Sequence, residues 1–154
     1  VDRVQYVKDA NEEIAALNTV VPTETAVVDA KFKDALTGWS EGHKDAESVV
    51  QLTSYEPNRL TYHVSSAKGG VVVFSEIYYP GWQATIDGAP VDIARADYIL
   101  RAMHVPSGSH TIEMWFEPQS IRVTETIAYV ALALLVIGVM AWVWRQKNNW
   151  IKGA

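Results

Sequence analysis

The feature that most constrains this chain is an uninterrupted apolar run near its C-terminal end. Residues 127–144 (IAYVALALLVIGVMAWVW) contain no charged residue and no Pro, Asn or Gln. At about 1.5 Å per residue, a helix of this length extends about 27 Å, close to the hydrocarbon thickness of a bilayer. A buried core helix is the alternative, but a small single domain rarely buries a helix that is apolar on every face. The run therefore predicts a transmembrane helix.

The charges on either side of the run predict its orientation. Glu125 precedes the run, whereas three basic residues follow it: Arg145, Lys147 and Lys152. The positive-inside rule places the basic end in the cytoplasm. We therefore expect a chain in the cell membrane, with an extracytoplasmic domain before the run and a cytoplasmic C-terminus.

Composition narrows the function classes. A net charge of −5, with no basic stripe before Arg145, argues against nucleic-acid binding. The absence of cysteine excludes disulfides, thiolate metal sites and a cysteine nucleophile. The chain starts at Val1 without an initiator Met or a signal peptide, so we expect a fragment of a longer membrane protein.

The segment before the run has the pattern of many short strands. Leu60, Tyr62 and Val64 alternate with polar residues, and Asp87-Gly88 is typical of a two-residue hairpin turn. Residues 71–77 start apolar on both faces, which predicts the central strand of the core sheet. The other predicted strands are 25–32, 48–55, 60–65, 82–86, 91–94, 99–105 and 110–116. This spacing predicts a mainly β chain with an antiparallel β-sandwich or jelly-roll-like domain.

A short helix is expected at the N-terminal end. Val7, Ala10, Ile14 and Leu17 follow helical spacing, which predicts a helix over residues 2–19. The predicted organisation is a helix and lead-in (1–24), an extracytoplasmic β-sandwich (25–118), a linker (119–126), a transmembrane helix (127–144) and a cytoplasmic tail (145–154).

The sequence predicts no catalytic residue, metal site or cofactor. The histidines show no HExxH or HxH spacing, and no GxSxG, GxxxxGK[ST] or GxGxxG motif occurs. The carboxylates are scattered. Asp97, between Arg95 and Tyr98, is conceivable as a catalytic acid, but a paired-carboxylate site needs a separation that sequence does not supply.

Aromatic residues form the most distinctive cluster. Tyr78, Tyr79 and Trp82 surround Pro80-Gly81, and Tyr98 follows along the chain. Exposed rings of this kind stack on sugar faces, although packing within a small sandwich also accounts for them.

Arg101 is a further candidate for contact with a ligand. It could pair with Asp97 or Glu113, or face the phosphate or carboxylate of a ligand. The candidate glycan-binding residues are therefore Tyr78, Tyr79, Trp82, Tyr98 and Arg101.

Residues 75–118 resemble the C-terminal segment of the bacterial YfhO family of membrane proteins. They read SEIYYPGWQATIDGAPVDIARADYILRAMHVPSGSHTIEMWFEP, against a family pattern YYPGW…DG…(R/N)ADY.LRA..VP.G.H.I...(F/Y).P that is followed directly by a final transmembrane helix. The matching positions are Tyr78, Tyr79, Pro80, Gly81, Trp82, Asp87, Gly88, Ala96, Asp97, Tyr98, Leu100, Arg101, Val105, Pro106, Gly108, His110, Ile112 and Pro118.

The resemblance implies a large polytopic protein related to membrane glycosyltransferases of the GT-C type. Such proteins take sugar from a polyprenyl-phosphate donor and modify cell-envelope glycans or teichoic acids. Their catalytic acidic residues lie in an extracytoplasmic loop near the N-terminus, and no position here matches that loop. The implied partners are the rest of the parent protein, the lipid bilayer, and a cell-envelope glycan or polyprenyl-linked sugar.

Three functional hypotheses follow. The first is a non-catalytic accessory domain, with the last membrane helix, that positions a glycan acceptor for a glycosyltransferase-like parent. The second is a membrane-anchored carbohydrate-binding module that acts through Tyr78, Tyr79, Trp82 and Tyr98. The third is a purely structural or assembly domain.

Overall fold

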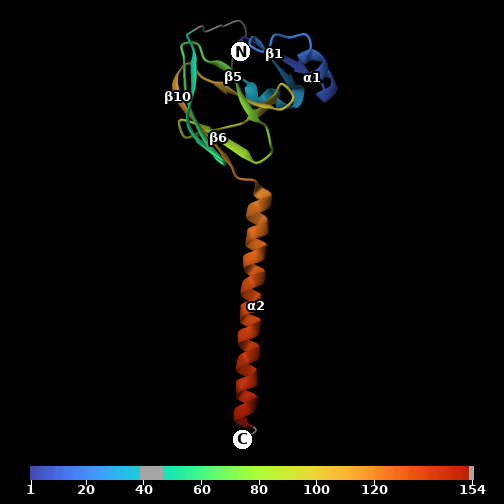
Figure 1. The fold of residues 1–154 in the computed structure, drawn as a ribbon, viewed down its shortest axis with the longest axis vertical. Coiled ribbons are helices and arrows are strands. Elements are labelled where there is room, and N and C mark those ends of the chain that lie inside the picture. Colours follow the sequence, from blue (N-terminus) through green and yellow to red (C-terminus); the bar gives the residue numbers. More distant parts are fainter. Residues whose placement is uncertain (39–46, 153–154) are drawn as a thin grey trace. The chain divides into compact units, whose positions relative to one another are not determined.

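The computed structural model describes residues 1–38 and 47–152, and for residues 119–122 and 146–152 it describes the backbone alone. The chain divides into two units, Val1–Glu117 and Pro118–Ala154. The first unit is a β-domain built from two five-stranded sheets, and the second is a single long helix (Figure 1).

The first sheet contains the N-terminal strands. Its order is β1-β2-β8-β9-β5. The bounds are β1 Arg3–Val7, β2 Thr25–Asp29, β5 Gly70–Ile77, β8 Ala94–Ala96 and β9 Leu100–Val105. The β1–β2 pair is parallel, and the other pairs are antiparallel.

The second sheet is wholly antiparallel, in the order β3-β4-β10-β6-β7. Its strands are β3 Val49–Glu56, β4 Arg59–Ser66, β6 Trp82–Ile86, β7 Ala89–Val91 and β10 Gly108–Phe116. The central strand, β10, pairs with β4 on one side and β6 on the other.

The main core lies between the two sheets. Phe74, Met103 and Val105 of the first sheet pack with buried side chains of the second: Leu60, Tyr62, Val64, Ala84, Ile86, Ile112 and Met114. Burial alternates along β4, as the sequence pattern indicated. The predicted mainly antiparallel β-sandwich, with a short N-terminal helix and a C-terminal apolar helix, is confirmed.

A second core covers the opposite face of the first sheet. Val71 and Ala102 alternate along their strands with the inward-facing residues, and they pack with Leu36 of the 3₁₀ helix η1 (Ala30–Leu36). The prediction that residues 71–77 form the central strand of the core sheet was wrong. The strand β5 is at the edge of its sheet, not at the centre, and it is apolar on both faces because each face has its own core.

The N-terminal helix is shorter than the predicted span of 2–19. The helix α1 runs over Ala10–Leu17, where the Asp9 carboxylate accepts hydrogen bonds from the amides of Asn11 and Glu12. Arg3–Val7 is instead strand β1, because parallel pairing with β2 satisfies its backbone and buries Val4 and Val7. The strand predicted at 25–32 ends at Asp29, whose carboxylate caps η1.

The hairpin predicted at Asp87-Gly88 is confirmed. Both residues have positive φ, 51° and 82°, as a type I′ turn requires. The return strand β7 covers Ala89–Val91, whereas residues 94–96 cross to the other sheet as β8. The prediction of one strand over residues 91–94 was therefore wrong.

The hairpin turn also holds an ion pair. Asp87 Oδ2 lies 2.7 Å from His110 Nδ1, and the Thr111 amide donates to Asp87 Oδ1. His110 Nε2 lies 3.2 Å from the Ser107 carbonyl oxygen. Because both ring nitrogens face acceptors, the geometry favours the protonated imidazole. The carboxylate and carbonyl raise the pKa of His110, and the bonds from His110 and Thr111 lower the pKa of Asp87.

We expect this pair to stabilise the domain in a limited pH window. The raised pKa of His110 gives a contribution that is complete below about pH 6.5 and is lost as the pH rises through the folded-state pKa. The lowered pKa of Asp87 gives a contribution present above about pH 3.8 and lost as the pH falls through its folded-state value. The melting-temperature difference between wild type and His110→Gln should thus be largest near pH 5 and shrink towards pH 9. The comparison is His63→Gln, whose ring contacts the Ser109 hydroxyl and has only the smallest of the effects on the pKa of Asp87, so its difference should vary less with pH. A pH-independent difference for His110→Gln would contradict the prediction.

The second unit is the helix α2, Gln119–Lys152. Its segment Val123–Arg145 is long and apolar enough to cross a membrane, and none of its residues is packed into a protein core. This exposure disfavours the alternative of a buried core helix. Helical backbone already begins at Gln119, so residues 119–126, which the sequence predicted as a linker, form the first turns of the helix.

Candidate functional site

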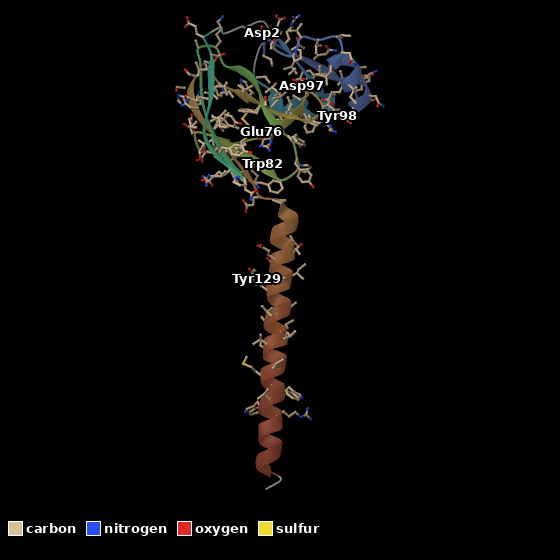
Figure 2. All side chains as sticks on the ribbon, viewed as in Figure 1. Asp2, Glu76, Trp82, Asp97, Tyr98 and Tyr129 are labelled. Carbon is tan, nitrogen blue, oxygen red and sulfur yellow. The ribbon has the colours of Figure 1, made fainter. Side chains whose placement is uncertain are left out.

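A pocket of about 330 Å³ lies where η1 meets the turn between β5 and β6. Its walls combine aromatic rings with charged side chains: Phe32, Tyr78, Tyr79 and Trp82, together with Lys31, Asp34 and Asp92. Three of the five predicted glycan-binding residues therefore meet at one pocket. Tyr98 and Arg101 do not line it, and Figure 2 shows Tyr98 at a separate place on the domain from Trp82.

Local structure fixes how the aromatic residues lie. Tyr78 packs edge-on against Phe32, with ring centroids 5.4 Å apart, and its amide donates to the Ile99 carbonyl. Tyr79 and Trp82 both contact the ring of Phe116, at centroid distances of 6.0 and 5.6 Å. The Tyr79 side chain nevertheless stays 62% exposed. The pocket thus has aromatic walls whose rings contact one another or Phe116, and one of these rings, Tyr79, is open to solvent.

Arg101 lies behind one of these aromatic rings, inside the domain. It is only 3% exposed, and its guanidinium carbon lies 3.7 Å from the centroid of the Trp82 ring. Its Nε donates to the Ile77 carbonyl at 2.9 Å. The predicted partners pair elsewhere, because Glu113 binds Arg59 and Asp97 accepts the Val27 amide. Arg101 therefore contacts the Trp82 ring from inside the domain, and its role in ligand binding stays a prediction.

Tyr98, which is itself 38% exposed, contacts a buried charge cluster next to the pocket. Tyr98 and Asp97 have positive φ, 72° and 50°, and this turn points the Tyr98 amide at Glu13 Oε1, 2.8 Å away. Arg95 binds the other oxygen of Glu13 at 2.6 Å. The Arg95 guanidinium also lies over the rings of Tyr98 and Phe32, at 5.4 and 5.9 Å. Since Phe32 lines the pocket, Arg95 connects the charge cluster to the pocket wall.

Burial is the largest cause of the pKa shift at Glu13 and Asp97, but not at Asp29. Glu13 has no exposed surface, and desolvation raises its pKa against the opposing effects of the Tyr98 amide and Arg95. Burial likewise raises the pKa of Asp97. The pKa of Asp29 is lowered, chiefly because its carboxylate accepts the Lys31 amide. The contacts of the cluster link α1, β2 and the 96–98 turn to one another.

Sequence reasoning missed the contribution of η1. Lys31, Phe32 and Asp34 reach the pocket because the 3₁₀ helix begins where a strand was predicted to continue. The only local signal is Asp29, a residue type that caps helices. Glu13 was also missed, because it does not belong to the apolar positions of the predicted helix and its partner Arg95 is 82 positions away.

The arrangement suits a ligand that has both an apolar face and polar groups at its edge. The flat aromatic rings of the pocket can stack on the apolar face of such a ligand. The carboxylates and the lysine of the pocket can hydrogen-bond to the polar groups at the edge of the ligand. Among the residues that the structure describes, no group of three or more His, Cys, Asp or Glu could hold a metal ion.

Comparisons with known proteins identify relatives. A family model described as bacterial membrane protein YfhO matches residues 39–128, more than half of the chain. An uncharacterized protein YfhO from Bacillus subtilis (strain 168) is 28% identical over 83 residues, which is 54% of this chain and 10% of that relative. The chain thus spans about a tenth of the relative's length. No solved structure matches. The family match includes Tyr78, Tyr79 and Trp82, whereas η1 lies outside it.

Proposed function

The chain belongs to the YfhO family of bacterial membrane proteins, and on this basis we propose that it is a non-catalytic accessory domain with the final membrane helix of a longer envelope protein. The family resemblance read from residues 75–118 is confirmed by the match. The parent protein would be glycosyltransferase-like and use a polyprenyl-linked sugar, with its reactive centre in another part of that protein. The β-domain would position a glycan acceptor.

The distribution of charge supports an extracytoplasmic β-domain. Near the apolar segment the chain carries four basic side chains: Arg122, Arg145, Lys147 and Lys152. Three of those four basic residues follow the apolar segment, the side that the positive-inside rule assigns to the cytoplasm.

We expect single cysteines to report this orientation cleanly, because the chain has no cysteine of its own. A cysteine at Ser107, in an exposed turn of the β-domain, should react with a membrane-impermeant maleimide in intact spheroplasts. A cysteine at Asn149 should react only after the membrane is permeabilised. The reverse labelling pattern would invert the proposed topology.

The observation that carries the glycan proposal is the aromatic pocket with carboxylates at its edge. Tyr79 offers an exposed ring, Trp82 a half-buried one, and Asp34 and Asp92 are exposed beside them. A sugar presents C–H groups on one face and hydroxyls around its rim, which this combination matches.

We expect Tyr79→Ala and Asp92→Asn each to weaken binding of cell-envelope oligosaccharides by about 1–2 kcal/mol, or roughly 5- to 30-fold in Kd. Titration calorimetry of the whole chain in detergent micelles would measure the loss. Tyr55→Ala is the matched control, since Tyr55 is similarly exposed, at 67%, but lies on β3 outside the pocket. Equal affinity for all three variants and the wild type, or no binding to any, would reject the glycan proposal.

A second candidate function, assembly with other parts of the parent protein, is favoured by the edge strand β3. Val50, Leu52 and Tyr55 pair with Val64, Tyr62 and Leu60, so they point to the core-facing side of the sheet. They are nevertheless exposed, and a second pocket, of about 480 Å³, opens beside Val50. An uncovered apolar edge of this kind suits a partner segment.

A further inference from the structure

We propose that the free edge of β5 binds one extended segment from another part of the parent protein, which adds a strand to the first sheet and packs against Val50 and Leu52 of β3. This inference rests on the second candidate function, assembly with the parent protein. It is independent of glycan binding, because the pocket beside Val50 and the aromatic pocket have no residue in common.

The first sheet ends one strand short of the second. Phe74 of β5 packs on Tyr62 of β4, with ring centroids 4.8 Å apart, so β5 lies over β4. Within the described part of the chain, no strand lies beyond β5 to cover β3. The core-facing Val50 and Leu52 are accordingly 45% and 43% exposed, although Val64 and Tyr62, their partners on β4, are buried. One more strand, about 4.8 Å beyond β5, would cover them.

The main chain of β5 has hydrogen-bonding groups that point to this free side. The Asp97 amide donates to a carbonyl of β2, so the main chain of Asp97 faces β2 and that of Ala96 faces β9. Counting alternate residues through the β8–β9 and β9–β5 registers, the N–H and C=O groups of Val71 and Val73 point away from β9. The Val1 ammonium group donates to the Val71 carbonyl at 2.8 Å, in agreement with this orientation. Groups of this kind on an edge strand pair readily with an added strand.

The 480 Å³ pocket follows this edge. It is lined by Val72, which packs on the main core, and by Val71 and Val73, which pack on the core of the opposite face. A pocket that reaches both faces of an edge strand must include its free edge. From Gly70 to Ser75 this edge is about 17 Å long at about 3.3 Å per residue, enough for five or six residues of an extended segment.

The geometry favours a single strand over a second copy of this chain. Two copies joined through β5 by a twofold axis would lie with their first sheets side by side. The β3 of each copy would then collide with β4 of the other, because β4 lies under β5 in both. A single extended segment, with apolar side chains at alternate positions to meet β3, avoids this collision. The chain spans about a tenth of the length of its YfhO relative, so a parent of that size has enough chain outside residues 1–154 to supply the segment.

The first test compares maleimide labelling of Leu52→Cys and Val49→Cys in the full-length parent protein and in the 154-residue chain, each in an otherwise cysteine-free background. Val49 is the matched control, because it is 52% exposed on the same strand but pairs with Ser65 on the opposite face of the sheet. We expect position 52 to react severalfold more slowly in the parent than in the chain, and position 49 to react at similar rates in both. Equal rates at position 52 would overturn the proposal together with the assembly candidate.

Hydrogen exchange tests whether the covering segment is a strand. The amides of Val71 and Val73 should exchange severalfold more slowly in the parent than in the chain, because they gain hydrogen bonds. The amides of Val72 and Phe74 already face β9 and should change little. Slow labelling at position 52 with unchanged exchange at positions 71 and 73 would overturn strand addition and leave the assembly candidate standing.

A photo-crosslinking residue, Val50→benzoylphenylalanine, identifies the source of the segment. In the parent protein we expect an adduct within the same polypeptide, at residues outside 1–154 that alternate apolar and polar side chains. Adducts only to a second copy, to another protein or to lipid would overturn the proposed occupant. None of these outcomes affects the glycan proposal, whose variants change residues of the other pocket.

Discussion

Replacing Glu13 with alanine is expected to lower the free energy of unfolding of the β-domain by about 3–5 kcal/mol. The substitution removes a fully buried carboxylate that binds both the Arg95 guanidinium and the Tyr98 amide. Arg95 then remains largely buried with only the more distant Asp29 carboxylate, 3.8 Å away, to offset its charge. Urea unfolding of the whole chain in micelles, followed by tryptophan fluorescence, would measure the loss. Because Arg95 lies over Phe32, the variant should also loosen the pocket wall.

Two further substitutions show how much of the lost free energy of unfolding comes from the burial of the Glu13 carboxylate. Glu24→Ala removes a carboxylate that pairs with Arg3 at 3.6 Å on the surface, where such pairs contribute about 0–1 kcal/mol. Glu13→Gln keeps an acceptor for the Tyr98 amide but removes the charge, so its cost should lie between the other two. If Glu13→Ala costs no more than Glu24→Ala, the buried cluster does not stabilise the domain as described.

Replacing Gly69 with alanine should destabilise the domain by about 2–4 kcal/mol, because two penalties combine. Gly69 has φ of 70°, a conformation that costs a residue with a Cβ about 1 kcal/mol or more. An added Cβ would also lie 2.7 Å from backbone atoms of Val105, Pro106 and Ser107. Since these are main-chain atoms at the end of β9, they can move only if the strand moves.

Gly88→Ala is the matched comparison for this prediction. Gly88 has φ of 82°, but nothing lies within 4 Å of its added Cβ, so only the conformational penalty of about 1 kcal/mol applies. The difference between the two variants in the midpoint of urea unfolding therefore isolates the steric clash. Equal losses of stability in the two variants would mean that the loop at Pro106 moves away from the added Cβ without a loss of free energy.

Short-range signals predicted the elements well. The alternation along Leu60, Tyr62 and Val64 identified β4 and its buried face, and Asp87-Gly88 identified the hairpin, because each depends only on neighbouring residues. What sequence did not predict is set by distant parts of the chain. The edge position of β5 follows from the two cores that pack on it, and Arg3–Val7 is a strand only because β2 is available for pairing.

In the candidate site, too, sequence predicted the contacts between neighbouring residues but not those between distant parts of the chain. Tyr78, Tyr79 and Trp82 are close in sequence and meet at one pocket, whereas Lys31, Phe32 and Asp34 reach it from a segment more than 40 residues earlier. From the sequence, Arg101 was a candidate either for pairing with Asp97 or Glu113 or for contact with a ligand phosphate or carboxylate. In the fold its partners are the Trp82 ring and the Ile77 carbonyl, and neither contact has a sequence signature.

The central position of β10 has a consequence for the order in which the protein is made. β10 joins β4 to β6, yet it is the last strand of the domain and ends three residues before α2 begins. The second sheet therefore cannot close until residue 116 has emerged, and long-range pairing of this kind is slow. In the proposed topology, the β-domain would complete its folding only when the membrane helix is already entering the bilayer. Until then, the unpaired edges of β4 and β6 would be available to chaperones or to aggregation.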